Sequence, residues 1–212
     1  MERNRGRLVT FEGGEGTGKT TQLERLATFL EARGVSVVRT REPGGTQGAE
    51  AIRALLLDGA ADRWSARSEL LLFAAARQDH LEKVIEPALA AGSWVLCDRY
   101  LDSTRVYQGI AGELGLAFVD HLQSTVLGFR LPDLTVLLDL PVEHGLARRS
   151  RDGRATRFEQ KGTSFHERVR EGFLELARRE PERFLLVDAD RAVDAVAAEI
   201  ARTVAARFGL PP

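Results

Sequence analysis

Hydrophobic residues along this chain occur in short continuous runs, separated by longer segments in which they recur with helical spacing. The short runs, each of strand length, lie at 7–12, 35–38, 94–97, 134–138 and 184–187. Segments with apolar residues three and four positions apart lie at 23–30, 50–57, 67–89, 117–127, 143–151, 164–178 and 193–208. Continuous apolar strands that alternate with helices are typical of a parallel sheet covered on both faces. We therefore predict an α/β protein with a five-stranded parallel sheet.

The composition is that of an ordinary globular protein, with 43% hydrophobic and 29% charged residues. A net charge of -1 argues against a general nucleic-acid or membrane-surface binder. The 212 residues contain no internal repeat or linker, so we predict a single domain over 1–212. The start of the chain is polar, and no run approaches 18 apolar residues, which predicts a cytoplasmic location. The single Cys97 excludes a disulfide framework.

A glycine-rich segment lies between the first predicted strand and the first predicted helix. It fits the pattern G-x-x-x-x-G-K-[ST], in which glycines let backbone N–H groups close around phosphate oxygens. Lys19 is expected to reach the β- and γ-phosphates, and the Thr20 hydroxyl to ligate Mg²⁺. The sequence therefore predicts a three-layer P-loop NTPase fold. Its predicted nucleotide-binding residues are Gly13, Gly14, Glu15, Gly16, Thr17, Gly18, Lys19, Thr20 and Thr21.

Residues that follow the predicted strands are candidates for the rest of the site, because ligands bind beyond the carboxyl ends of parallel strands. Asp98 is positioned to hold Mg²⁺ or to orient a phosphate acceptor, and Arg99 suits bidentate phosphate binding. A surface ion pair is the alternative for these two residues. Phe73 and Arg77 stand four apart on the long predicted helix, so they share a face on which a base could stack. A phenylalanine in an apolar run is also a common core residue.

Five arginines within ten residues surround a glycine after the fourth predicted strand. They are Arg148, Arg149, Arg151, Arg154 and Arg157. Such a charge run is by default a solvated face. A P-loop, however, leaves the transferred phosphoryl group to be covered from water and its developing charge to be neutralised. We therefore predict an arginine-rich lid at about 148–160.

Taken together, these segments resemble the bacterial thymidylate kinases, which are P-loop nucleoside-monophosphate kinases. The resemblance extends from Leu8 to about Phe208. It rests on residues 11–13 leading into the loop, on TREPGGT at 40–46, on LFAAAR at 72–77 and on DRYLDSTRVYQG at 98–109. It implies a homodimeric enzyme that transfers the γ-phosphoryl group of ATP to dTMP with Mg²⁺, for dTTP biosynthesis, without nucleic-acid or membrane partners.

The resemblance also implies roles for individual residues. Phe73 would stack on thymine, Arg77 would bind its carbonyl edge, and Glu15 would hold the 3′-hydroxyl of deoxyribose. The implied dTMP-binding residues are Glu15, Arg53, Phe73, Arg77, Arg99, Ser103, Thr104, Tyr107 and Gln108. The implied catalytic residues are Lys19, Asp98, Arg99, Arg149, Arg151 and Arg154, and the implied Mg²⁺ ligands are Thr20 and Asp98. Tyr107 is either a steric gate against a 2′-hydroxyl or a packing tyrosine.

Two positions bear on the lid. Gly16 stands where another subtype of the family carries an arginine, so the lid must supply the catalytic arginine here. Thr156 precedes Arg157, Phe158 and Glu159 where bacterial relatives often have an acidic residue, which leaves the pairing within the lid open.

Other functions remain as alternatives. Another P-loop nucleoside-monophosphate or deoxynucleoside kinase would take a different acceptor and would lack the segment REPGG at 41–45. A nucleotide-dependent switch ATPase or GTPase would not need an arginine lid, and the sequence has no Asn-Lys-x-Asp motif for guanine. If the chain is a dimer, we expect the helices at 67–89 and 117–127 to form the interface.

Overall fold

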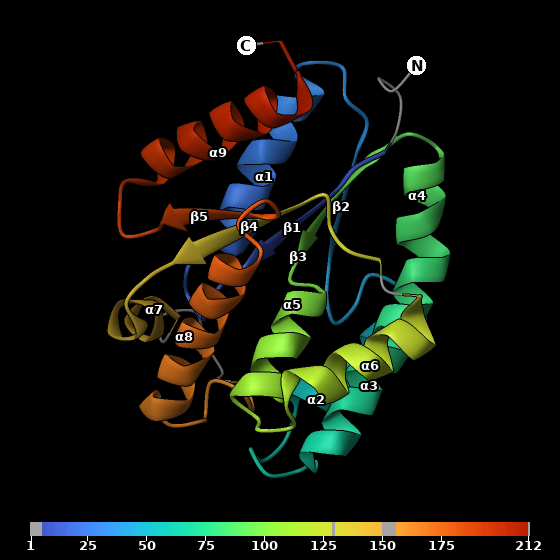
Figure 1. The fold of residues 1–212 in the computed structure, drawn as a ribbon, viewed down its shortest axis with the longest axis vertical. Coiled ribbons are helices and arrows are strands. Elements are labelled where there is room, and N and C mark those ends of the chain that lie inside the picture. The colour runs from blue at the N-terminus through green and yellow to red at the C-terminus, as the bar shows by residue number, and fades with distance from the viewer. Residues whose placement is uncertain (1–5, 129, 150–155, 212) are drawn as a thin grey trace.

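The computed structural model describes residues 6–128, 130–149 and 156–211. Within these residues the chain forms five strands: β1 (Leu8–Glu12), β2 (Val37–Arg41), β3 (Trp94–Asp98), β4 (Leu134–Asp139) and β5 (Phe184–Asp188). Neighbouring strands are parallel, and their order in the sheet is β2-β3-β1-β4-β5. The predicted five-stranded parallel sheet is therefore confirmed (Figure 1).

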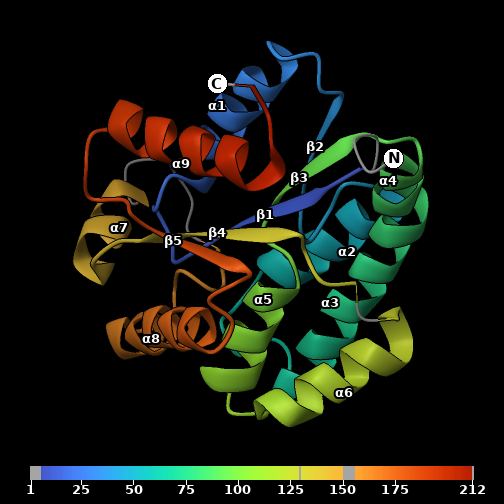
Figure 2. The same cartoon turned by 45° about the horizontal axis from the view of Figure 1, so that its top comes forward.

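Helices cover both faces of this sheet. The helical segments of the described residues are α1 (Lys19–Glu31), α2 (Gln47–Leu57), α3 (Ala66–His80), η1 (Leu81–Ile85), α4 (Glu86–Ala90), α5 (Leu101–Thr104), η2 (Arg105–Ile110), α6 (Leu116–Leu127), α7 (Val142–Arg149), α8 (Thr163–Arg179) and α9 (Val193–Phe208), where η1 and η2 are π-helical. Figures 1 and 2 show α1 and α9 on one face, with α8, α5 and α3 on the other. The three-layer arrangement predicted from the alternating pattern is confirmed.

The central strands β1, β3 and β4 are buried almost throughout. On one face Phe11 of β1 and Ile200 of α9 belong to one core cluster, and on the other Leu137 of β4 and Phe173 of α8 belong to a second. The edge strands β2 and β5 are only partly buried. Helices cover both faces of the central strands, so side chains on both faces must be apolar or hydrogen-bonded. This requirement produces the continuous apolar runs in the sequence.

The long helix predicted at 67–89 is continuous in space but changes its winding. It runs from α3 through the π-helical turn η1 into α4. Pro87, which has no backbone N–H to donate, lies at the second position of α4, directly after the π-helical turn. A π-helical turn inserts one extra residue per turn and shifts the face that the following turn presents.

The segment 101–110 forms a helix that the sequence pattern did not predict. α5 and η2 bury polar side chains on the face that looks into the protein, namely Asp102, Thr104, Arg105 and Gln108. Leu101, Val106 and Tyr107 are buried as well, so the helix is enclosed on most sides and its apolar residues form no single stripe that a helical periodicity could detect. These buried polar groups belong to the candidate site and to the ion pairs behind it.

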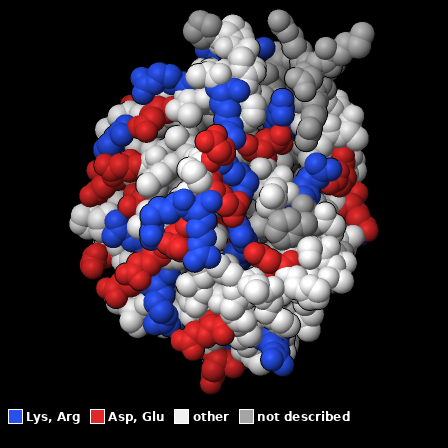
Figure 3. All heavy atoms as spheres, viewed as in Figure 1, with Lys and Arg blue, Asp and Glu red and all other residues white. Residues whose placement is uncertain are grey.

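The described residues contain no helix that is long and apolar enough to cross a membrane. On the face in Figure 3, basic and acidic side chains are interspersed. This mixture agrees with the net charge of -1.

Candidate active site

The glycine-rich loop lies between the carboxyl end of β1 and the start of α1. Gly16 has a φ of 67°, and a Cβ at this position would overlap the carbonyl oxygen of Gly145 on α7. Only glycine fits here, because the backbone of α7 lies directly against the loop. Nζ of Lys19 donates hydrogen bonds to the carbonyl oxygens of Gly14 at 2.6 Å and Gly13 at 3.3 Å. The ammonium group is therefore held inside the loop, where phosphate oxygens bind in proteins of this motif.

A cavity of about 480 Å³ opens beside this loop, at the carboxyl ends of β1, β2 and β3. Most of the residues predicted from the sequence line it: Glu15, Gly16, Thr17, Gly18, Lys19, Thr20, Thr21, Arg53, Phe73, Arg77, Asp98, Arg99, Ser103, Thr104, Tyr107 and Gln108. Gly13 and Gly14 instead line a smaller cavity behind the loop. Residues far apart in the sequence thus meet in one cavity, as the strand-end rule leads one to expect.

The predicted arginines of the lid are the exception. Arg149 is the last residue of α7, and Arg151 and Arg154 lie outside the described residues. Arg148 lines the cavity and pairs with Asp190 at 3.2 Å. Neither the arginines at 149, 151 and 154 nor the lid itself is therefore tested by the structure.

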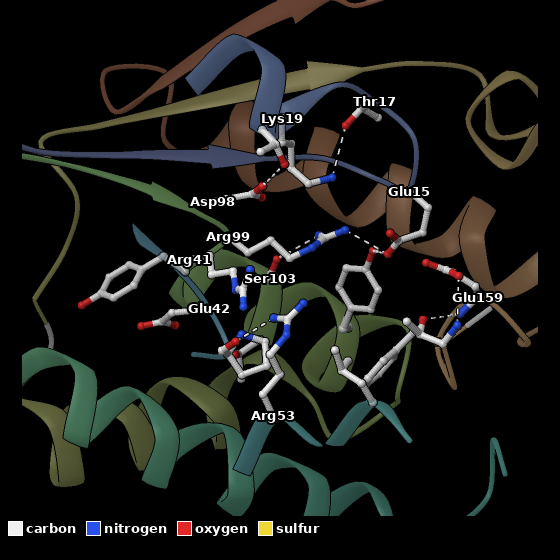
Figure 4. Close-up of a pocket in the computed structure, with 18 of the residues that line it drawn as sticks. Glu15, Thr17, Lys19, Arg41, Glu42, Arg53, Asp98, Arg99, Ser103 and Glu159 are labelled. Carbon is white, nitrogen blue, oxygen red and sulfur yellow. Dashed lines mark hydrogen bonds and ion pairs between the residues drawn. The ribbon is translucent and has the colours of Figure 1, made fainter. Parts of the chain in front are cut away.

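Thr20 and Asp98 bring oxygen atoms together at the mouth of the loop. The Thr20 hydroxyl donates to Oδ2 of Asp98 at 2.6 Å. Figure 4 shows Asp98 beside Lys19 and above Arg99. A hydroxyl and a carboxylate are hard oxygen donors of the kind that Mg²⁺ takes from a protein. The donor set fits Mg²⁺ next to a bound phosphate chain.

Arg99 connects the loop to the residues that follow β3. Its guanidinium donates to Oε1 of Glu15 at 2.9 Å, to the carbonyl oxygen of Gly13 at 3.0 Å and to Oγ of Ser103 at 3.2 Å. Burial alone would raise the pKa of Glu15, but the charges of Arg99 and Lys19 outweigh it and lower this pKa to about 2. Tyr107 also donates to Oε1 of Glu15, at 2.9 Å. Glu15 is thus an anion held in place beside the loop, with its carboxylate facing the guanidinium of Arg99 (Figure 4).

Arg53 of α2 points into the same space from the opposite side (Figure 4). Its guanidinium donates to the carbonyl oxygen of Pro43 at 2.7 Å. Burial, and next the nearby charge of Arg41, lower the pKa of Arg53. Arg53, Arg99 and Lys19 therefore place positive charge around one part of the cavity in a protein that is almost neutral overall, an arrangement that favours a negatively charged ligand.

The far end of the cavity is apolar and aromatic, with one buried arginine. Phe73 lies 6.0 Å from the ring of Phe158, and Tyr107 lies 5.9 Å from the same ring. Arg77 is only 2% exposed and donates to Glu42 at 2.7 Å, to Gln123 at 2.8 Å and to Thr104 at 3.0 Å. The rings supply surfaces for a planar ligand, and the fixed guanidinium supplies donors at its edge.

Three acidic residues of the site were not predicted from the sequence. Glu42 holds Arg77, and Glu69 holds Gln108 at 2.8 Å. Glu12 accepts from the backbone N–H groups of Tyr100 and Ser103 at 2.8 and 3.1 Å, and from the Ser103 hydroxyl at 2.6 Å. Burial, and next the charge of Asp102, raise the pKa of Glu12 to about 7. Its place at a strand end was visible in the sequence, but its partners lie in a distant segment of the chain.

Arg157 belongs to the predicted lid, yet it is anchored inside the protein with 1% of its surface exposed. Its guanidinium binds Glu69 at 2.9 Å and the carbonyl oxygens of Leu56, Ala60 and Ala61. Beside it, Glu159 accepts from the backbone N–H of Thr156 at 3.0 Å. An arginine with these partners cannot reach a phosphoryl group, so among the five arginines of the segment Arg157 is a structural residue.

Comparisons with known proteins agree with one another. A family model described as thymidylate kinase matches residues 11–200. Thymidylate kinase of Caulobacter vibrioides is 56% identical over 97% of this chain and 99% of its own length. That of Ruegeria pomeroyi is 53% identical over 94% of both chains. A crystal structure of thymidylate kinase from Ehrlichia chaffeensis superposes with a TM-score of 0.76, at 34% identity, over 94% of this chain and 99% of that one.

Proposed function

This chain belongs to the thymidylate kinase family, and we propose that its cavity binds ATP and dTMP head to head and transfers the γ-phosphoryl group between them. The products are dTDP and ADP. The observation that carries the proposal is the convergence, in one cavity, of the P-loop lysine, two acceptor-side arginines and an aromatic end with a buried arginine. Each of these features matches one part of the two substrates.

The donor side is the loop at 13–21. Its backbone N–H groups and Lys19 bind the β- and γ-phosphates of ATP, where α1 adds the positive end of its dipole. Thr20 and Asp98 would hold Mg²⁺, which would offset the negative charge of the phosphates. The protein's own part is to orient the phosphate chain and to supply fixed positive charge, since the transition state of phosphoryl transfer is loose and rich in charge.

The acceptor side holds dTMP with its phosphate toward the loop. Arg53 and Arg99 bind this phosphate, and Glu15 accepts from the 3′-hydroxyl of deoxyribose. An oxygen of the dTMP phosphate attacks the γ-phosphorus, and the bond from that phosphorus to the β,γ-bridging oxygen breaks. Tyr107 lies against Glu15, so its ring occupies the space beside the sugar. This supports a role in excluding a 2′-hydroxyl.

The thymine ring lies at the aromatic end, stacked on Phe73. Arg77 donates to a carbonyl oxygen of the base. The thymine methyl group is worth only about 1–3 kcal/mol in an apolar pocket, so we expect dUMP to be a poorer but real substrate.

A lid arginine completes the charge around the transferred group. Gly16 carries no side chain that could do so, and Arg157 is held by Glu69. Arg148 lines the cavity but is paired with Asp190 at 3.2 Å, and we propose Arg149, Arg151 and Arg154 as the catalytic arginines. An arginine supplied to the transition state of phosphoryl transfer is worth roughly 10³ to 10⁵ in rate.

We expect an ADP-release assay to identify the substrate. With ATP and Mg²⁺, turnover should be strongest on dTMP among dTMP, dUMP, UMP, dCMP, CMP, AMP and GMP. Lys19→Ala should reduce kcat by about 10³ or more, because it removes charge that acts on the transferred group. Strongest turnover on a cytidine or purine nucleotide would contradict the thymine site. ATP hydrolysis that is indifferent to every acceptor would favour a switch ATPase instead.

The family resemblance also supports a cytoplasmic homodimer. Leu71 of α3 and Phe118 of α6 are 57% and 42% exposed, and the two helices contact each other. Large apolar side chains exposed side by side are typical of an interaction surface. We propose the joint surface of α3 and α6 as the dimer interface.

A further inference from the structure

A chain of three buried side chains connects Arg157, near the end of the predicted lid segment, to the base end of the cavity. Arg157 donates to Oε2 of Glu69 through both terminal nitrogens, at 2.9 and 3.1 Å. The other carboxylate oxygen, Oε1, accepts from Nε2 of Gln108 at 2.8 Å. Glu69 lies on α3 and Gln108 on η2, and the exposed fractions of Arg157, Glu69 and Gln108 are 1%, 6% and 1%.

This chain fixes the orientation of the Gln108 amide. A carboxylate paired with an arginine can only accept, so the NH₂ group of Gln108 must face Glu69. The reverse orientation would place two oxygen atoms against each other at hydrogen-bond distance. Oε1 of Gln108 is consequently turned away from Glu69, and it is buried without a hydrogen-bond partner among the described residues. Gln108 lines the cavity, so this oxygen is an acceptor without a partner at the base end.

An acceptor at this place distinguishes the pyrimidines. Thymine and uracil carry a hydrogen on N3, next to a carbonyl oxygen at C4, whereas cytosine has a lone pair on N3 next to an amino group. The Gln108 oxygen matches an N3–H, and Arg77, which can only donate, matches the C4 oxygen. Against cytosine both contacts become repulsive, and buried polar groups without partners are costly.

We propose that Glu69 is a specificity-determining residue that acts through Gln108. By holding the amide with its oxygen toward the base, it makes the site accept nucleotides with a protonated N3 and reject cytidine nucleotides. Arg157 is the positioning residue that directs Oε1 of Glu69 to Gln108, because it occupies Oε2 with both of its terminal nitrogens. This inference rests on the proposed function.

The variant Glu69→Gln tests the orientation without a change of size. Arg157 will hold the oxygen of the new amide at position 69, as it holds Oε2 now, so the new NH₂ group will face Gln108 and turn its amide around. The NH₂ group of Gln108 then faces the base, where it opposes N3–H and matches the lone pair of cytosine. We expect the ratio of kcat/KM for dTMP over dCMP to fall at least about tenfold, with the ratio for dTMP over dUMP unchanged.

The exchange variant Glu69→Gln/Gln108→Glu restores the acceptor. The amide at position 69 again binds Arg157 through its oxygen, and it donates to the new carboxylate at position 108, whose second oxygen faces the base. One carboxylate remains in the cluster, so the buried Arg157 keeps a nearby anion, which also limits the loss of stability that Glu69→Gln alone causes. We expect this variant to prefer dTMP over dCMP within about threefold of the wild-type ratio.

A matched control is available on the same continuous helix. Gln78 donates to the exposed Glu82 at 2.6 Å, which is the same type of pair outside the cavity. Glu82→Gln should change no substrate ratio. If Glu69→Gln lowers kcat/KM for dTMP, dUMP and dCMP in parallel, Glu69 only supports the fold and the inference is overturned. An exchange variant that folds but lacks the preference for dTMP also overturns it. A wild-type enzyme without preference for dTMP would instead refute the proposed function.

Discussion

The charged residues of this site form pairs of opposite sign that are in direct contact. Arg99 is bound to Glu15, Arg77 to Glu42 and Arg157 to Glu69, each at 2.7–2.9 Å. Buried pairs of this kind add little net stability, because desolvation offsets their attraction, but each fixes a guanidinium or carboxylate in one orientation. The carboxylates therefore hold the guanidinium groups of a site that binds two polyanions in place, and they balance much of its positive charge.

The raised pKa of Glu12 predicts that the stability of the protein depends on pH. Its folded pKa of about 7 lies above the ordinary value of 4.5, so the protonated form is favoured on folding. The resulting stabilisation is fully present below pH 4.5 and is lost as the pH rises through about 7. Because one pKa unit corresponds to about 1.4 kcal/mol, we expect the free energy of unfolding of wild type, relative to Glu12→Gln, to fall by roughly 3 kcal/mol over this interval. Urea unfolding of both proteins at about pH 4.5 and about pH 8 measures it. A difference that does not change with pH would contradict the raised pKa.

Elements meet at this site backbone to backbone as well as through side chains. A Cβ on Gly145 of α7 would overlap the carbonyl oxygen of Glu15 in the loop, and a Cβ on Gly16 would overlap that of Gly145. The first turns of α7 therefore form a wall of the P-loop. The helix that leads into the predicted lid is therefore in direct backbone contact with the loop that forms the phosphate site.

Gly145→Ala tests this contact. Alanine favours helix formation over glycine by about 1 kcal/mol, so α7 itself should not suffer, but the new methyl group must displace the loop. We expect KM for ATP to rise about tenfold or more, with the far-UV circular dichroism unchanged. Gly162→Ala is the control, since a Cβ there meets no described atom within 4 Å and its φ is -62°. An unaltered KM in Gly145→Ala would show that the loop does not depend on this packing.

The whole molecule is connected behind the site by a buried ion cluster. Arg183, which precedes β5, donates to both oxygens of Asp102 on α5, at 2.6 and 2.8 Å. Arg105 bridges the same Asp102 to Glu180. Asp102 is fully buried, and its neighbour Ser103 lies in the candidate site. The cluster thus fixes the unpredicted helix 101–110 to a distant part of the chain.

Removal of the Asp102 charge should destabilise the protein as a whole. Asp102→Asn leaves Arg183 and Arg105 without their shared buried anion, and breaking a buried pair typically costs about 3–5 kcal/mol. Urea unfolding at about pH 7 measures the loss. Glu175→Gln, which removes the anion that pairs with Arg178 and Arg179 at the surface, should leave the free energy of unfolding almost unchanged, because solvent screens exposed ion pairs. If both variants lower the free energy of unfolding by the same amount, the buried cluster contributes no more to stability than a surface ion pair.

The proposed dimer is also a property of the whole molecule. We expect light scattering at micromolar concentration to give twice the mass of the 23.4 kDa chain. Phe118→Glu should shift the protein toward monomer, because it buries a charge in the interface. Leu186→Glu, at an apolar residue that is 50% exposed on β5, is the matched control. A wild-type monomer would refute the dimer.

Features that rest on local geometry could be predicted from the pattern of residues. The loop at 13–20 is encoded by glycines at positions of positive φ and by one lysine, and the parallel sheet by continuous apolar runs. With the rule that ligands bind at strand ends, these patterns also located Asp98 and Arg99. Helical spacing made Phe73 and Arg77 candidates for a base site, and the family motifs then assigned them to thymine and added Gln108.

The contacts that hold these residues in place are visible only in the folded chain. The helix 101–110 escaped prediction because polar and apolar residues are buried around it without a single apolar stripe, and Arg157 could not be separated from its four arginine neighbours by composition. Glu12, Glu42 and Glu69 were missed because each acts on a partner 35 to 91 positions away. Patterns of hydrophobicity report whether a side chain is buried, but a buried polar group is defined by its partner, and only the folded chain brings the two together.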